Sequence, residues 1–247
     1  MASRIILVTG SNDGIGYELV RLLAQQTEGH KVYLSSRNEE KGKEAQAKLK
    51  AEHGVEVKYV QLDVTDEKSI LAAKALIEKE EGRLDVLVNN AGILSRSPAA
   101  IADLPAFRTQ FETNFFGLIS TTTAFIPLLR QSSAVQGFAV ILNVTSGLSS
   151  NANQAKASIR NPGPFSPYSA SKAALNAYTI SLGHELKPEN IRVNVVTPGI
   201  TATNFNGFLG NRTAEDGARV LLPFALLGAE DADKTVLFHG PDGEMPW

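Results

Sequence analysis

The chain has 247 residues, of which 43% are hydrophobic, so it is long enough for one α/β domain and can fill a sizeable core. A net charge of −2 at pH 7 gives no general attraction to nucleic acid or to an anionic membrane, and we expect small-molecule partners instead. There is no cysteine, which excludes a disulfide framework, a thiolate nucleophile and a cysteine-ligated metal.

Seven apolar runs alternate with helical patterns along the chain. Continuous apolar runs bounded by glycine or polar residues are typical of strands buried on both faces of a parallel sheet. The predicted strands are residues 5–9, 32–34, 55–62, 84–88, 138–144, 191–196 and 235–238, and the predicted helices begin after Gly14 or span about 39–52, 67–81, 104–129 and 168–187. This alternation predicts the α/β class: a single-domain, doubly wound Rossmann fold over residues 1–247, with a seven-stranded parallel sheet and helices on both faces.

Two stretches interrupt the alternation. Residues 147–167 are rich in Ser, Asn, Gly and Pro, and residues 200–227 follow a strand end with Gly, Asn and Thr. Ligands of open parallel sheets bind beyond the carboxyl ends of the strands, so we predict that both stretches are loop walls of a substrate pocket. The charge-rich segment 39–58 is interpreted as a solvated helix face.

Other patterns exclude several classes of protein and site. No apolar run reaches the roughly 18 residues of a membrane span, and the run after Arg4 is too short for the core of a signal peptide, so we expect a cytoplasmic protein. No GxSxG motif is present, which removes the serine-hydrolase alternative. The histidines are scattered without metal-ligand spacing, so no metal is expected; they are His30, His53, His184 and His239.

A glycine-rich turn closes the first predicted strand and opens the first predicted helix. It reads Thr9-Gly10-Ser11-Asn12-Asp13-Gly14-Ile15-Gly16, with the spacing GxxxGxG, which differs from both GxGxxG and a Walker A loop. Glycines let backbone N–H groups approach a phosphate, and a helix N-terminus favours its negative charge. The turn therefore predicts nucleotide binding, with a ligand-free tight turn as the alternative.

Tyr168 and Lys172 are four residues apart, so on a helix both side chains leave the same face about one turn apart. A fixed positive charge favours the phenolate of a nearby tyrosine and suits it to acid/base work. The alternative is a surface helix that happens to carry one Tyr and one Lys, because the YxxxK spacing alone is common.

Together with these two motifs, the chain resembles the short-chain dehydrogenase/reductase family, whose glycine pattern is TGxxxGxG. The stretch from Gly14 to Gly92 looks closest to the carbonyl-reductase-like branch. Each further motif is weak alone, but the ordered set covers nearly the whole chain: Asp63-Val64, Asn89-Asn90-Ala91-Gly92, Asn114, Ser146, Tyr168 with Lys172, and Pro198-Gly199.

The resemblance implies a catalytic tetrad of Asn114, Ser146, Tyr168 and Lys172. Tyr168 would exchange a proton with the carbonyl oxygen, and Ser146 would hydrogen-bond that oxygen. Lys172 would lower the tyrosine pKa and bind the nicotinamide ribose, while Asn114 would hold a water in a proton relay. A turn serine and a structural amide are the alternatives for Ser146 and Asn114.

The choice of cofactor depends on the end of the second predicted strand. NAD preference requires an acidic residue there, but this chain has Ser36, followed by Arg37, whose forked donors suit a 2′-phosphate. We therefore expect NADP(H), with NAD(H) as the alternative because the charge of Asp13 opposes a phosphate.

The resemblance also implies the remaining cofactor contacts. Asp63 could instead cap a turn, and Thr201 or Thr203 could cap a short helix. The expected cofactor-binding set is Gly10, Ser11, Asn12, Gly14, Ile15, Gly16, Arg37, Asp63, Val64, Asn90, Ala91, Gly92, Tyr168, Lys172, Pro198, Gly199, Ile200, Thr201 and Thr203.

One departure from the family concerns the segment before Tyr168, which follows Ser146 by 22 positions. This distance indicates an insertion beside the substrate, and it leaves open whether the protein is a monomer or a homo-oligomer. Apolar residues around Ile159, Phe165 and 204–210 suggest a pocket for a medium-sized hydrophobic carbonyl compound.

The sequence thus predicts an NADP(H)-dependent oxidoreductase that reduces a ketone or aldehyde to an alcohol, or runs the reverse reaction. An NAD-linked alcohol dehydrogenase and a dinucleotide-binding regulatory protein without turnover are the alternatives.

Overall fold

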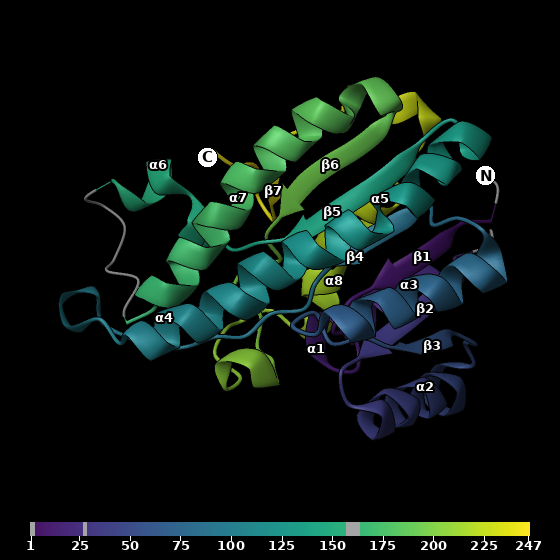
Figure 1. The fold of residues 1–247 in the computed structure, drawn as a ribbon. Coiled ribbons are helices and arrows are strands. Elements are labelled where there is room, and N and C mark those ends of the chain that lie inside the picture. The colour runs from purple at the N-terminus through teal and green to yellow at the C-terminus, as the bar shows by residue number, and fades with distance from the viewer. Residues whose placement is uncertain (1–2, 27–28, 157–163) are drawn as a thin grey trace.

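A parallel sheet forms the centre of the molecule (Figure 1). The computed structural model describes residues 3–26, 29–156 and 164–247. Within these residues the sheet has eight strands in the order β3-β2-β1-β4-β5-β6-β7-β8. The strands are β1 Ile5–Val8, β2 Lys31–Ser36, β3 Lys58–Gln61, β4 Val86–Asn89, β5 Ala139–Val144, β6 Ile191–Val196, β7 Phe238–Gly240 and β8 Gly243–Glu244.

The first seven strands are parallel and β8 returns antiparallel to β7, so the predicted α/β fold with a doubly wound parallel sheet is confirmed and gains one short strand. The last predicted strand was misplaced by three residues. Residues 235–237 precede β7, and Val236 has a φ of 60°, which extended backbone does not adopt.

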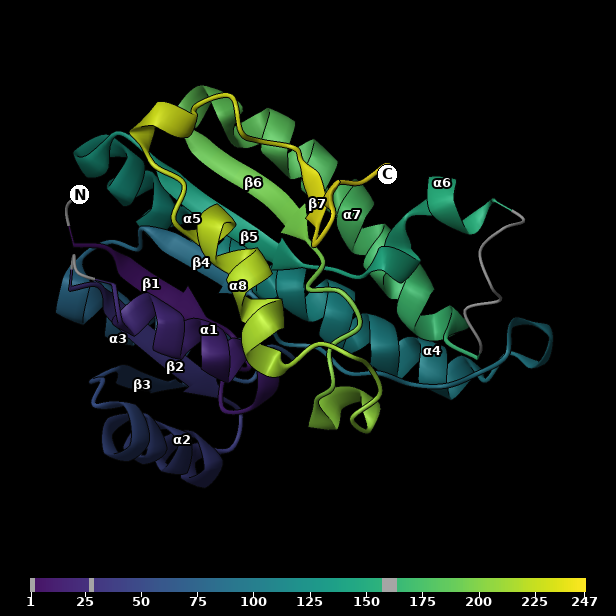
Figure 2. The ribbon, with the colours of Figure 1, turned by 180° about the vertical axis from the view of Figure 1, so that it is seen from behind.

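Helices cover both faces of the sheet. They are α1 Gly14–Ala24, α2 Glu39–His53, α3 Glu67–Glu81, α4 Leu104–Phe111, α5 Gly117–Gln136, α6 Asn151–Gln154, α7 Ser166–Leu186 and α8 Ala214–Ala225. Figure 1 shows α3, α5 and α7 on one face, and Figure 2 shows α1 and α8 on the other, with α2 beside β3. No helix within the described ranges is both long and apolar enough to cross a bilayer.

Strand β1 shows why the apolar runs become central strands. Ile5 and Leu7 pack into the core on the side of α3 and α5, and Ile6 and Val8 pack into the core on the side of α1 and α8. All four side chains are buried, so a single alternating strand contributes to both layers.

Three segments expected from the sequence are compared with the structure below. Residues 200–227 are not loop throughout, because α8 begins at Ala214 and buries Ala218 and Leu221 against the sheet. The expected helix 104–129 is interrupted by a π-helical turn, η2 (Glu112–Phe116), between α4 and α5. Within the expected loop 147–167, Ile159 lies outside the described residues, and the short helix α6 is present.

The strand order places β1 between β2 and β4. Successive connections run toward β3 on one side and toward β7 on the other, which makes the carboxyl ends of β1 and β4 a topological switch point. A crevice at this point is where open α/β sheets bind their ligands.

Candidate active site

A cavity of about 1380 Å³ opens at the carboxyl ends of the strands. Its walls come from the turns after β1, β4, β5 and β6 and from the first turns of α7. Of the predicted site residues, all but two line it; the exceptions are Ser11 and Asn114. The structure therefore brings together residues from position 10 to position 245 of the chain.

The glycine turn after β1 is held against the turn after β4. Gly10 has a φ of +58°, and a Cβ at this position would lie 2.9 Å from the Cα of Ala91. A Cβ at Gly16 would lie 2.5 Å from Nδ2 of Asn90, which donates to the carbonyls of Thr9 and Gly10 at 2.9 Å each. Only glycine fits at these two points, and the N-terminus of α1 is left facing the cavity.

Ser11 has a different position from the one expected of a cofactor contact. Its side chain is fully buried, and its hydroxyl donates to the carbonyl of Val8 at 2.8 Å and accepts from the N–H of Ser35 at 2.9 Å. Ser11 thus ties the end of β1 to β2, and its side chain does not reach the cavity.

Arg37 follows β2 and is exposed at the cavity, whereas Ser36 is buried and its hydroxyl accepts from the N–H of Asn38 at 3.2 Å. Asp13 also lines the cavity, but its carboxylate accepts from the N–H of Gly14 at 2.7 Å and caps α1. The negative charge of Asp13 is therefore balanced in part by the helix N-terminus.

Asp63 lines the same end of the cavity and also stabilises a turn. Its Oδ1 accepts from the N–H of Thr65 at 2.9 Å and from the Thr65 hydroxyl at 2.7 Å. The turn-forming alternative for Asp63 is therefore present in the structure, with Oδ2 left for other contacts.

The hydroxyl-bearing residues Ser146 and Tyr168 both line the cavity. Ser146 follows β5 and its Oγ accepts from the N–H of Leu148 at 3.2 Å, which caps the short 3₁₀ turn Gly147–Ser149. Tyr168 lies in the first turn of α7 and its hydroxyl is hydrogen-bonded to Ser146. One turn later, the Nζ of Lys172 donates to the carbonyl of Val144 at 2.8 Å.

The surroundings of Tyr168 and Lys172 change both pKa values. Burial raises the pKa of Tyr168 to about 12, although the hydrogen bond from Ser146 acts in the opposite direction. Burial lowers the pKa of Lys172 to about 8. Desolvation dominates the pKa of Tyr168 in this structure, where the Lys172 ammonium is bonded to a backbone carbonyl, and the expected lowering of that pKa by Lys172 stays a prediction.

Asn114 lies behind the cavity wall, in the π-helical turn η2. Its Oδ1 accepts from the N–H of Ile93 at 2.8 Å, and its Nδ2 donates to the carbonyl of Ile93 at 3.0 Å and to Oγ of Ser171 at 3.2 Å. A Cβ at Gly92 would meet Oδ1 of Asn114 at 3.2 Å and Nζ of Lys172 at 3.8 Å. The amide therefore holds the turn after β4 beside Lys172.

The substrate side of the cavity is largely apolar. The ring of Phe205 meets the ring of Tyr168 edge-on, with centroids 5.8 Å apart, and Phe165 lines the cavity as well. Leu148, Asn153 and Gln154 lie in the predicted pocket loop 147–167 and line the cavity as expected. Sequence reasoning missed Leu94 and Met245, for which the sequence carries no periodic or motif signal.

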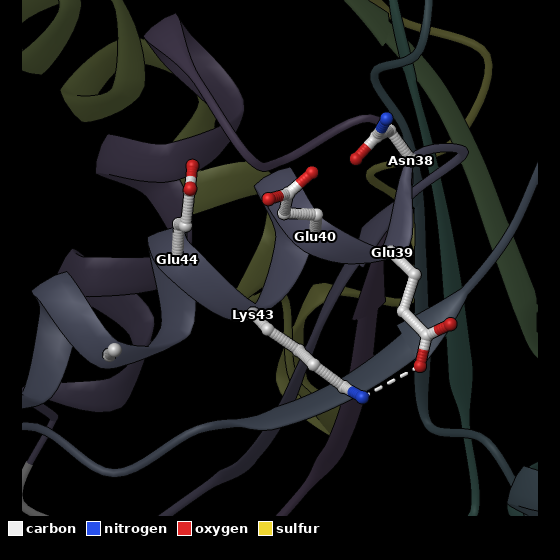
Figure 3. Close-up of a pocket in the computed structure, with 6 residues that line it drawn as sticks. Asn38, Glu39, Glu40, Lys43 and Glu44 are labelled. Carbon is white, nitrogen blue, oxygen red and sulfur yellow. Dashed lines mark ion pairs between the residues drawn. The ribbon is translucent and has the colours of Figure 1, made fainter.

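A second depression, of about 770 Å³, lies on the first turns of α2 (Figure 3). It is lined by Asn38 and by charged residues of this helix, and Lys43 pairs with Glu39 at 2.7 Å. The side chains stand out from the helix rather than converge, so this surface agrees with the predicted solvated helix face of residues 39–58 over α2, which ends at His53.

Comparison with known proteins agrees with this geometry. The model of the short chain dehydrogenase family matches residues 4–214. The short-chain dehydrogenase anuI of Penicillium roqueforti is 34% identical over 231 residues, covering 91% of this chain and 89% of that protein. Carbonyl reductase [NADPH] 3 of Mus musculus is 32% identical and covers 91% of each chain. The NADPH-bound carbonyl reductase from chicken fatty liver superposes with a TM-score of 0.86, at 27% identity and full coverage of both chains.

Proposed function

Because the chain belongs to the short chain dehydrogenase family, we propose that it is an NADP(H)-dependent oxidoreductase that reduces a ketone or aldehyde, with Tyr168 as the proton donor. One observation carries the proposal: Ser146 and Tyr168 line the same cavity as the glycine turn and the N-terminus of α1. A hydride donor bound along this cavity and a carbonyl compound at the two hydroxyls would share one enclosed site.

The residues present fit a dinucleotide. The glycine turn lacks the Cβ atoms that would fill it, and the α1 N-terminus offers N–H groups to a diphosphate. Arg37 would hold the 2′-phosphate of NADP(H), because its guanidinium is exposed at the cavity and no carboxylate occupies position 36. The nicotinamide cofactor supplies or accepts the hydride when it is bound.

Tyr168, Ser146 and Lys172 would have different roles in proton transfer. With a pKa of about 12, Tyr168 keeps its proton at neutral pH and can give it to the substrate oxygen as the new C–H bond forms. Ser146 hydrogen-bonds the substrate oxygen. It also stabilises the Tyr168 phenolate that remains after proton transfer, because a hydrogen bond from Ser146 lowers the pKa of Tyr168. Lys172, with a pKa of about 8, is mainly protonated at pH 7 and provides a positive charge one turn away.

Asn114 acts as a positioning residue in this proposal. Its amide joins the turn after β4 to Ser171 of α7, which keeps Lys172 and Tyr168 at a fixed distance from the cofactor side of the cavity. Both of its polar atoms are already bonded to protein, so its contribution is to hold this arrangement together.

Fluorescence titration of the purified protein with NADPH and with NADH, followed by a panel of ketones and aldehydes, tests the function. We expect tighter binding of NADPH and loss of its absorbance in the presence of a carbonyl compound. Tight binding without turnover of any carbonyl or alcohol would favour a regulatory protein, and a preference for NADH would favour the NAD-linked alcohol dehydrogenase.

A further inference from the structure

The segment after β8 returns to the catalytic end of the sheet. We call residues 243–247 the tail. The hairpin of β7 and β8 pairs His239 with Glu244, and the N–H of Met245 donates to the carbonyl of Phe238 at 2.7 Å. Figure 2 shows the end of the chain beside β7 and α7, on the same side of the molecule as α6. The tail therefore lies between the core and the segment that follows Ser146.

Two backbone oxygens of the tail hold the α6 segment. Oγ of Ser150, the N-cap of α6, donates to the carbonyl of Pro246 at 2.6 Å. The N–H of Ala152 donates to the backbone oxygen of Trp247 at 2.9 Å. A helix of this length forms too few internal bonds to be stable alone, so these contacts fix its place.

The ring of Trp247 anchors the tail in turn. It packs against the fully buried ring of Phe238, with centroids 5.5 Å apart and an interplanar angle of 48°. Aromatic pairs of this kind add to the stabilisation that comes from buried area. The chain of contacts thus runs from the core through Trp247 to α6.

Met245 is the tail residue whose side chain lines the cavity. It passes over Gly240, where a Cβ would lie 2.8 Å from its Sδ, and its Cε reaches 3.9 Å from a Cβ built on Gly147. Gly147 directly follows Ser146, so the thioether lies next to the residue that would bind the substrate oxygen. A methionine here is apolar and adapts its shape to what it contacts.

We propose that the tail and α6 form one substrate-selecting wall, in which Met245 contacts the body of an apolar ketone and Trp247 is a positioning residue that holds α6. This inference rests on the proposed reductase function. The wall limits the size of the group attached to the carbonyl carbon, since the end of the Met245 side chain occupies space beside Gly147, the residue after Ser146.

Met245→Ala tests the direct contact. Removing the thioether enlarges the pocket, so the ratio of kcat/KM for a bulky aryl ketone to that for a small cyclic ketone rises by about tenfold, the scale of a lost apolar contact. Met245→Leu keeps most of the volume, so its ratio lies between those of the parent and Met245→Ala. The dissociation constant of NADPH stays the same in both variants. An unchanged ratio in Met245→Ala, with NADPH binding intact, overturns the contact.

Trp247→Ala tests the positioning role. We expect KM for the ketone to rise several-fold while kcat is largely kept, and hydrogen exchange of the Ala152 amide to speed up while α1 is unaffected. Trp247→Phe keeps an aromatic ring on Phe238 and restores both readouts. If the Ala152 amide of Trp247→Ala exchanges at the same rate as in the parent protein, the positioning role of Trp247 is overturned.

The two proposals fail in distinguishable ways. If the parent protein binds NADPH but reduces no ketone, the reductase function fails and the contact of Met245 with substrate fails with it. If the parent protein reduces ketones and Met245→Ala leaves selectivity unaltered, only the wall is overturned. The hydrogen-exchange measurement needs no turnover, so it tests in either case whether Trp247 holds α6 in place.

Discussion

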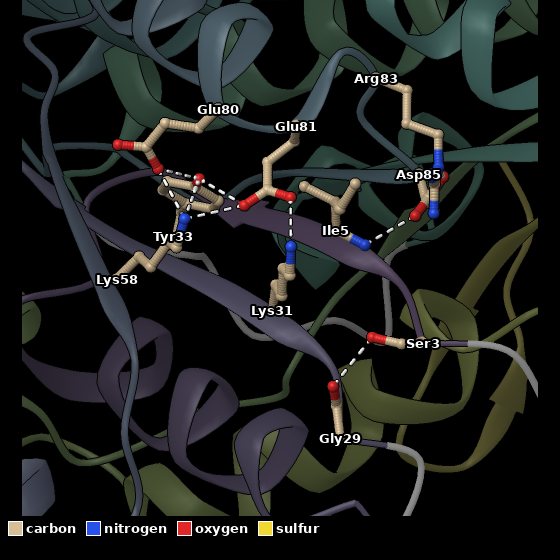
Figure 4. Close-up of polar contacts among 10 residues, drawn as sticks. All are labelled: Ser3, Ile5, Gly29, Lys31, Tyr33, Lys58, Glu80, Glu81, Arg83 and Asp85. Atoms are coloured by element: carbon tan, nitrogen blue, oxygen red, sulfur yellow. Dashed lines mark hydrogen bonds and ion pairs between the residues drawn. The ribbon is translucent and has the colours of Figure 1, made fainter.

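Two tyrosine–lysine pairs lie at opposite ends of the sheet, and only the pair at the carboxyl ends lines the large cavity. At the amino ends of the strands, Nζ of Lys58 lies 3.1 Å from the hydroxyl of Tyr33 (Figure 4). At the carboxyl ends, Tyr168 and Lys172 line the large cavity. The residue types are the same, so what surrounds each pair decides its use.

At the amino ends, carboxylates form hydrogen bonds with both members of the pair Tyr33 and Lys58. The Tyr33 hydroxyl donates to Glu80 at 2.7 Å, and Lys58 bonds Glu80 at 2.6 Å and Glu81 at 2.8 Å. Burial and these carboxylates raise the pKa of Tyr33, and hydrogen bonds to Glu80 and Glu81 raise that of Lys58. Lys31 completes the network by pairing with Glu81 at 2.7 Å. Both ionisable groups are held in their protonated forms, so this pair is structural.

No carboxylate contact is recorded for the pair at the carboxyl ends, among the residues that the structure describes. Burial lowers the pKa of Lys172 to about 8, and Tyr168 shares its hydrogen bond with a serine that faces the cavity. Polar groups that are buried at a cavity without charged partners are costly, and proteins retain them where a ligand completes the set. The comparison indicates that the charged groups around each pair, more than the residue types, distinguish the proposed catalytic pair from the structural pair.

Replacing the two tyrosines in turn gives the largest expected effect. Tyr168→Phe removes the proton donor, and we expect kcat/KM for ketone reduction to fall by roughly 10²–10⁴ while the dissociation constant of NADPH changes little. Tyr33→Phe is the matched control, since it removes the same atom at the other end of the sheet and leaves kcat unchanged. Equal loss of turnover in both variants would show that the hydroxyls act through stability alone.

Arg37→Asp tests the opposite end of the same cavity. The change removes a guanidinium and adds a carboxylate, which repels a 2′-phosphate and accepts from a ribose hydroxyl. We expect the ratio of kcat/KM for NADPH to that for NADH to fall by about 10–100-fold, the worth of a charge-assisted hydrogen bond. A ratio equal to that of the parent protein would place the 2′-phosphate elsewhere. Lys79→Asp, on the exposed face of α3, makes a similar change of charge outside the cavity and serves as the control.

Much of the fold and of this site follows from local sequence signals. The buried strands are continuous apolar runs, and the glycine turn and the Tyr168–Lys172 spacing are short motifs whose residues act together. Helix α8 was missed because Gly217 and Pro223 interrupt its helical pattern, although it packs on β5 and β6. The predicted position of strand β7 was three residues too early. This strand pairs with β6 over only two residues, so it has little local pattern to predict it.

Contacts between distant segments are what the sequence could not provide. The proximity of Met245 to Gly147 depends on how the β7–β8 hairpin turns, and no local pattern encodes it. The burial of Ser11 between β1 and β2 likewise depends on the register of those strands, which is why a motif residue proved to be a structural tie. Motifs thus point to the proposed reacting groups better than to the proposed substrate wall.

Glu81→Gln at the amino ends should reduce stability and leave catalysis intact. The Glu81 side chain is 3% exposed and accepts from Lys31, Lys58 and Tyr33, so we expect the free energy of unfolding to fall by about 2 kcal/mol, the scale of hydrogen bonds to a charged group. Chemical denaturation measures the loss, and kcat of the folded protein stays at the parent value. A drop in kcat with no change in stability would contradict the structural role.

The same variant has a definite pH dependence. Burial raises the pKa of Glu81, but the bonds from Lys31 and Lys58 outweigh it and lower the pKa below its ordinary 4.5. Such a carboxylate contributes stability that is present above pH 4.5 and is lost as pH falls through its folded-state pKa. The difference in unfolding free energy between parent and Glu81→Gln should therefore shrink on acidification.

The smallest effect is expected at Lys43, on the surface of α2 next to the Arg37 turn. Its ion pair with Glu39 joins side chains that are 62% and 56% exposed, so Lys43→Ala should change the free energy of unfolding by less than about 0.5 kcal/mol. The depression beside it is formed by side chains that point to solvent (Figure 3), so the dissociation constant of NADPH should also stay the same. Weaker NADPH binding in Lys43→Ala, measured at constant ionic strength, would extend the phosphate site from Arg37 onto α2. Unchanged binding confines cofactor recognition to the carboxyl ends of the strands, where the tyrosine–lysine pair lacking carboxylate partners lies.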